Sequence, residues 1–206
     1  MNIRLFFFLF LFGFSTLIFS QTPVKKNPSS NTSSAKTESP DIYIKILWLD
    51  NAGTLQLNED YIKTITEQQR AVLGYIATDV GSECHWDGEK KADKSNLKCK
   101  LLSALNLGYQ CSDTHLSFLK KWFKDDLKVL ERLQYCNKTE SSQKIQDGFV
   151  TLKMLTNEST IKIIYSAVGS DSNAQKKWSW IEESVYSFSK NEVKQTDRKN
   201  INGVYN

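Results

Sequence analysis

The chain has 206 residues, with 27 Lys and Arg against 23 Asp and Glu and a formal net charge of +4. This length is sufficient for one domain with a sizeable core. The positive residues are interleaved with acidic ones and form no basic block. Specific nucleic-acid binding, which usually needs a strong basic stripe, is therefore disfavoured, whereas weak attraction to anionic envelope polymers is compatible with this charge.

Residues 1–20 have the composition of a secretory signal peptide. Arg4 supplies one positive charge, Leu5–Phe19 form an apolar run, and Ser20 is a small residue at the expected cleavage site. The run is shorter than the roughly 20 residues that a membrane-spanning helix needs. We therefore expect cleavage after Ser20, export to a periplasmic or extracellular compartment, and no stable membrane insertion afterwards.

The next segment, 21–41, contains all three prolines and many Ser, Thr, Asn and Lys residues. It offers almost nothing apolar to bury, so we predict a disordered spacer. The folded domain is expected to span residues 42–206.

The first predicted element of that domain is a strand over 42–49. Alternation places four apolar residues on one face: Ile42, Ile44, Ile46 and Trp48. The sequence of residues 50–53, Asp-Asn-Ala-Gly, predicts a turn.

Two helices are expected next. Asn58 is a good N-cap, and an apolar stripe continues from Tyr61 to Val80, where Gly81 predicts the stop. A shorter helix is expected over 96–107, before Gly108.

The strongest helical pattern covers residues 113–135. It follows a capping cluster at Ser112 and has apolar residues at steps of three and four: Leu116, Leu119, Phe123, Leu127, Leu130 and Leu133. The favoured interpretation is a single helix with this stripe in the core. A partner-binding role would require part of the stripe to be exposed.

This helix constrains the cysteines that bracket it, Cys111 and Cys136. If it is continuous, their Cα atoms lie roughly 37 Å apart, whereas a disulfide needs about 4.4–6.8 Å. We favour continuity, which excludes this pair. The alternative is a break near 124–126, where Asp126 caps a second helix and the two cysteines come together.

After residue 148 the period changes to that of strands, with predicted strands over 149–155, 160–168 and 177–189. Short connections favour an antiparallel meander, and residues 190–206 are expected to be irregular. The predicted fold is therefore α+β, with one N-terminal strand, three helices and a three-stranded antiparallel meander, stapled by disulfides.

No residues form a catalytic, metal-binding or cofactor-binding signature. In an exported protein the cysteines are expected to form disulfides rather than a zinc site or a free nucleophile; they are Cys84, Cys99, Cys111 and Cys136. The chain lacks a Gly-x-Ser-x-Gly elbow. His115, in the first turn of a predicted helix, is interpreted as solvated. An enzyme is therefore disfavoured, and no cofactor is expected.

Aromatic residues provide the better candidates for recognition. His85, Trp86 and Asp87 lie in a polar loop and form the candidate partner-binding site, although Trp86 could instead plug a core. Trp178 and Trp180 share one strand face, where packing under the helices is the favoured interpretation. Aromatic faces also stack on sugars.

The sequence therefore predicts an exported, non-enzymatic binding or inhibitory module that acts on a protein or glycan. The alternatives are an envelope structural or assembly component and an unrecognised hydrolase. Neither the partner's identity nor the oligomeric state follows from the sequence.

Overall fold

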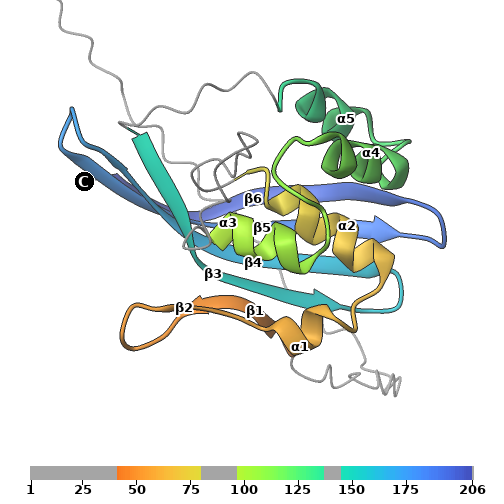
Figure 1. Cartoon of the computed structure of the whole chain (residues 1–206), viewed down its shortest axis with the longest axis horizontal. Coiled ribbons are helices and arrows are strands. Elements are labelled where there is room, and N and C mark those ends of the chain that lie inside the picture. Colours follow the sequence, from red (N-terminus) through yellow and green to blue (C-terminus); the bar gives the residue numbers. More distant parts are fainter. Residues whose placement is uncertain (1–40, 80–96, 137–144, 206) are drawn as a thin grey trace, which may run out of the picture. The chain divides into compact units, whose positions relative to one another are not determined.

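The computed structural model describes residues 41–79, 97–136 and 145–205, in which one antiparallel sheet has the strand order β2-β1-β3-β4-β5-β6 and carries helices on one face (Figure 1). The strands are β1 (Ile44–Leu49), β2 (Leu55–Leu57), β3 (Ile145–Thr156), β4 (Thr160–Asp171), β5 (Lys176–Phe188) and β6 (Val193–Tyr205). The helices are α1 (Glu59–Ile62), α2 (Glu67–Ile76), α3 (Leu97–Ala104), α4 (Asp113–Trp122) and α5 (Leu127–Gln134). The fold is α+β, but the predicted arrangement of one strand, three helices and a three-stranded meander is wrong.

The predicted N-terminal strand belongs to a hairpin. Asp50 Oδ1 accepts the backbone N–H groups of Ala52 and Thr54, at 2.9 and 2.8 Å, which fixes the turn into β2. The β1–β3 register shifts between Lys45 and Leu47, so that Ile46 and Leu47 are both fully buried. Simple alternation along this strand is therefore wrong.

The predicted helix from Asn58 is interrupted after one turn. A capping box starts α2: Thr66 Oγ1 accepts the N–H of Gln69, and Gln69 Oε1 accepts the N–H of Thr66 at 2.8 Å. Such a reciprocal pair satisfies two backbone donors that a helix start leaves unpaired. α1 and α2 are consequently separate helices.

The predicted long helix over 113–135 is also broken. α4 ends at Trp122, and Asp126 caps α5 by accepting the N–H of Val129 at 3.1 Å. The two helices form a hairpin, closed by a Cys111–Cys136 disulfide with a Cα–Cα distance of 5.7 Å. The prediction of disulfide bonding is confirmed here, whereas continuity and the exclusion of this pair are wrong.

The C-terminal segment, expected to be irregular, is the edge strand β6. It pairs with β5 from Val193 opposite Phe188 to Tyr205 opposite Trp178, with register shifts near Thr196 and Ile201. Its sequence shows little apolar alternation because an edge strand with one covered face needs few buried side chains.

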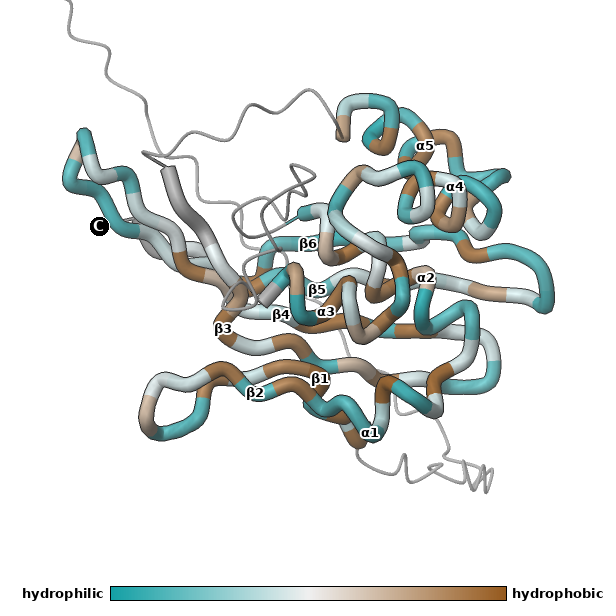
Figure 2. The backbone as a smooth tube through the Cα atoms, in the orientation of Figure 1, coloured by the Kyte–Doolittle hydropathy of each residue, from teal (hydrophilic) through white to brown (hydrophobic). Residues whose placement is uncertain are grey.

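The core lies between the sheet and the helices. Tyr75 of α2, Phe123 after α4 and Tyr186 of β5 are fully buried, with ring centroids 5.2–6.4 Å apart. Figure 2 shows hydrophobic stretches of α2, α3 and β1 within this layer and hydrophilic colour along much of the β5–β6 hairpin. None of the helices in the described ranges is long and apolar enough to span a membrane.

Candidate functional site

The loop chosen from the sequence, with His85, Trp86, Asp87 and the adjacent Cys84, lies outside the described residues. Cys99 of α3 is disulfide-bonded. The partner-binding role assigned to that loop stays a prediction.

His115 is fully buried, not solvated. Its Nδ1 accepts the N–H of Cys111 at 3.0 Å, so the proton is on Nε2, which donates to the carbonyl of Gly74, also at 3.0 Å. Burial lowers the pKa of the imidazole, and the charge of Lys98 lowers it further. His115 therefore joins α4 to α2 as a neutral ring. It also holds the backbone of Cys111, whose φ is +60°.

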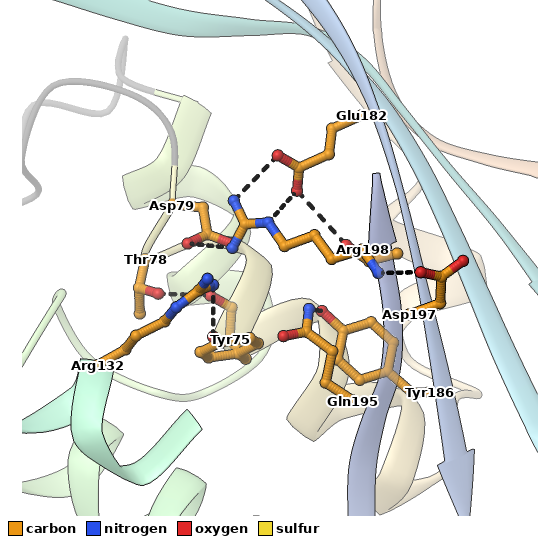
Figure 3. Close-up of polar contacts among 10 residues, drawn as sticks. Tyr75, Thr78, Asp79, Arg132, Glu182, Tyr186, Gln195, Asp197 and Arg198 are labelled. Carbon is orange, nitrogen blue, oxygen red and sulfur yellow. Dashed lines mark hydrogen bonds and ion pairs between the residues drawn. The ribbon is translucent and has the colours of Figure 1, made fainter. Parts of the chain in front are cut away.

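The strongest polar feature of the described chain is a charge cluster beneath the helices (Figure 3). Arg198 of β6 binds Glu182 of β5 in a bidentate manner: Nε lies 2.7 Å from Oε1 and Nη2 donates to Oε2 at 3.0 Å. Arg198 Nη1 also lies 3.2–3.3 Å from both carboxylate oxygens of Asp79, just after α2. One guanidinium thus joins a helix end to two strands.

Buried aromatic hydroxyls lie beside this charge cluster. Arg132 of α5 donates to the Tyr75 hydroxyl at 3.2 Å, and the Gln195 amide donates to the Tyr186 hydroxyl at the same distance. Burial raises the pKa of Tyr186, and the charge of Asp79 adds to the effect. These hydroxyls therefore act as neutral hydrogen-bonding groups.

Asp79 is the acidic group of the cluster whose pKa its surroundings shift. Burial raises the pKa of Asp79, and the charge of Arg198 offsets only part of this effect. Its Oδ2 is within ion-pair distance of Arg198 but has no aligned hydrogen bond. A carboxyl with a raised pKa is a candidate proton carrier. Because the same guanidinium holds both Asp79 and Glu182, however, the arrangement supports a structural clamp better than an acid–base pair.

A second feature concerns the tryptophans of β5. Trp180, Tyr186 and Phe188 pack on the buried core, so packing under the helices, the favoured interpretation for Trp178 and Trp180, holds for Trp180 alone of the two. Trp178 lies outside that core and is partly exposed. It is opposite Gly169 of β4, and its indole fills the space that a side chain at 169 would occupy. The absence of a side chain at Gly169 therefore leaves the space that the indole occupies.

Trp178 pairs with Gly169 of β4 on one side and with Tyr205 of β6 on the other. Figure 1 shows the β4–β5 hairpin, whose turn follows Asp171 and precedes Lys176, extending past the helices. Asp171 and Lys176 pair in register at the end of this hairpin, two positions from Gly169 and Trp178 respectively. Alternation places all four residues on one face. We call Trp178, Gly169, Asp171 and Lys176 the hairpin-end site.

Within 41–79, 97–136 and 145–205, no group of three or more His, Cys, Asp or Glu side chains is placed to hold a metal ion. The sequence signal for the hairpin-end site was the Trp-Ser-Trp alternation. The Arg198 cluster had no such signal, because Arg198 is 119 positions from Asp79 and 16 positions from Glu182.

No protein-family model, curated protein or solved structure matches this chain.

Proposed function

We propose that the protein is an exported, non-enzymatic binding module that acts on a glycan or protein, and that the hairpin-end site binds the partner. The observation that carries this proposal is the seating of Trp178 on Gly169 outside the buried core. A ring held by a glycine and by the strand ladder is already ordered, so little side-chain entropy is lost on binding.

A glycan is the partner class that this chemistry favours. A sugar ring presents C–H groups that pack on an aromatic ring and hydroxyl groups that need donors and acceptors. Trp178 supplies the first kind of contact, and the exposed Lys176 supplies a charged donor on the same face. A protein partner would more commonly require a wider apolar centre.

The experiment is a glycan-array screen of the exported protein, followed by calorimetric titration of the glycans that bind. Replacing Trp178 by Ala should weaken binding by about 30-fold, since stacked aromatic anchors contribute about 2 kcal/mol. Gly169→Ala should also weaken binding while keeping the tryptophan, because the added methyl group displaces the indole.

Trp48 provides the matched control. It is partly exposed on β1 but, one position from the inward-facing Leu47, points to the opposite face of the sheet. Trp48→Ala should bind glycans like the parent. Equal binding by the Trp178→Ala variant would refute the hairpin-end site. An array with no bound glycan would refute the glycan class, and crosslinking in the exported fraction would then test for a protein partner.

A further inference from the structure

The tip of the α4–α5 hairpin combines an exposed leucine with a group of lysines. Leu127, the first residue of α5, is 79% exposed, although the sequence pattern placed it in the core stripe. Four exposed lysines lie around it in sequence, in the last turn of α4, the connection and the first turn of α5: Lys120, Lys121, Lys124 and Lys128. We call these four residues the hairpin lysines.

The exposure of Leu127 follows from the break between the helices. Asp126 leaves the helical path and starts α5 with a new phase, so that Val129 and Leu133 are buried while Leu127 is on the outer side. The Asp126 cap and the Cys111–Cys136 disulfide fix both ends of α5. Leu127 is therefore held outward on a rigid element.

The charge around this leucine is mainly positive. Of the two aspartates in the turn, Asp126 is buried and already accepts two backbone N–H groups. Asp125 is exposed and lies 3.9 Å from Lys124 Nζ, a weak contact at this exposure. Lys194 of β6 is adjacent in sequence to Gln195, which Asp126 binds, but it lies 3.9 Å from Glu192 and so adds little net charge near the tip.

We propose that the tip of the α4–α5 hairpin docks peripherally on an anionic phospholipid surface, with the hairpin lysines against the headgroups and Leu127 in the interface. Lysines near an anionic leaflet each strengthen attachment about fivefold, and an apolar side chain adds burial at the headgroup boundary. This activity is independent of the hairpin-end site and goes beyond the proposed function.

An acidic protein is the competing occupant of this surface. Helix recognition by a protein groove usually reads apolar anchors spaced by three and four residues along one face. On α5, the position four residues after Leu127 is Glu131, and Leu130 is only partly exposed. A single leucine at a convex basic tip fits a lipid surface better.

The test is sedimentation of the purified protein with vesicles of phosphatidylglycerol and phosphatidylcholine, and with vesicles of phosphatidylcholine alone. Residues 1–20 are omitted, because their apolar run would partition into lipid by itself. The protein should sediment with the anionic vesicles only, and high salt should release it. Lys124→Glu/Lys128→Glu should weaken binding more than about 25-fold, and Leu127→Ser about tenfold.

Lys45→Glu/Lys63→Glu is the matched control. It makes the same charge change on β1 and after α1. These positions are near the β2–β1 edge of the sheet, whereas the α4–α5 hairpin is attached to β6 at the other edge. Its effect should stay below about threefold. The inference is overturned if the parent protein remains in the supernatant with anionic vesicles. It is also overturned if the Lys45→Glu/Lys63→Glu variant binds those vesicles as weakly as the Lys124→Glu/Lys128→Glu variant. Trp178→Ala should bind vesicles like the parent, which separates this result from a failure of the proposed glycan site.

Discussion

Asp126 Oδ2 accepts the backbone N–H of Gln195 at 2.7 Å, although the two residues are 69 positions apart. The other oxygen of the same carboxylate caps α5. One side chain thus starts a helix and attaches that helix to the edge strand β6.

Replacing Asp126 by Ala should lower the free energy of unfolding by about 2–4 kcal/mol. The loss combines an N-cap, worth about 1 kcal/mol, with a backbone N–H of Gln195 left unpaired, at about 1–3 kcal/mol. Urea unfolding followed by circular dichroism gives the value. Asp125→Ala, an adjacent but exposed aspartate, should change it by less than about 0.5 kcal/mol. Equal losses in the two variants would contradict the double role of Asp126.

The Cys111–Cys136 disulfide should contribute about 2–4 kcal/mol. It closes a loop with a sequence separation of 25, and a cross-link of that size removes considerable entropy from the unfolded chain. The Cys111→Ser/Cys136→Ser variant should unfold at a lower urea concentration than the parent. An unchanged midpoint would show that the Asp126 cap and His115 hold the hairpin without the covalent link.

The pH dependence of stability should report Asp79. Folding raises the pKa of Asp79 above its ordinary value of about 3.9, so between these two values the folded protein binds more protons than the unfolded chain. This contribution to stability is present at low pH and is lost as the pH rises through the folded pKa. Asp79→Asn lacks the contribution. The parent should therefore gain stability relative to the variant when the pH falls from 7 to about 4, as measured by urea unfolding. An equal difference at both pH values would contradict the burial of a titrating carboxyl.

His115 should produce the opposite slope in a different pH window. Burial lowers the pKa of His115 below the ordinary value of about 6.5, so the unfolded chain takes up the proton first as the pH falls. The stability due to the neutral ring is present above about pH 6.5 and is lost as the pH falls through the folded pKa. Between pH 7 and 5 the parent should lose stability that His115→Gln does not lose. Nitrogen NMR should find the proton on Nε2, and a ring that titrates near 6.5 would refute this assignment.

Local signals in the sequence predicted some elements and misplaced others. The Asp50 turn, the Asn58 cap and the starts of β4 and β5 follow from short-range patterns, whereas β3 begins at Ile145, four residues before the predicted start. The Thr66 capping box was readable but lay inside a continuous apolar period, and the same period concealed the break at Asp126. In each case backbone capping decided the structure, and periodicity alone does not report it.

Tertiary contacts were beyond sequence reasoning. His115 was expected to be solvated because it follows an N-cap, yet Gly74 of another helix supplies its partner. Arg198 is in a polar stretch without alternation, and its partners are on two other elements. The seating of Trp178 depends on the register that places Gly169 opposite it. Such pairings are fixed only when the sheet forms.

The strand order also indicates which strand pair should form last during folding. β3 to β6 pair as consecutive hairpins, each closed by a short connection, whereas β1 finds its partner in β3, with Trp48 opposite Thr151. Closing that pair restricts the whole stretch of chain between them, and contacts of such long sequence separation slow folding. Until β3 has been made, Ile46 and Leu47 have no strand on that side to cover them. A chain emerging N-terminus first therefore leaves β1 without its β3 partner from Leu49 until Thr156 has been made, about half of the 206-residue chain. Its protection from misassociation during that interval depends on how quickly β3 is made and pairs.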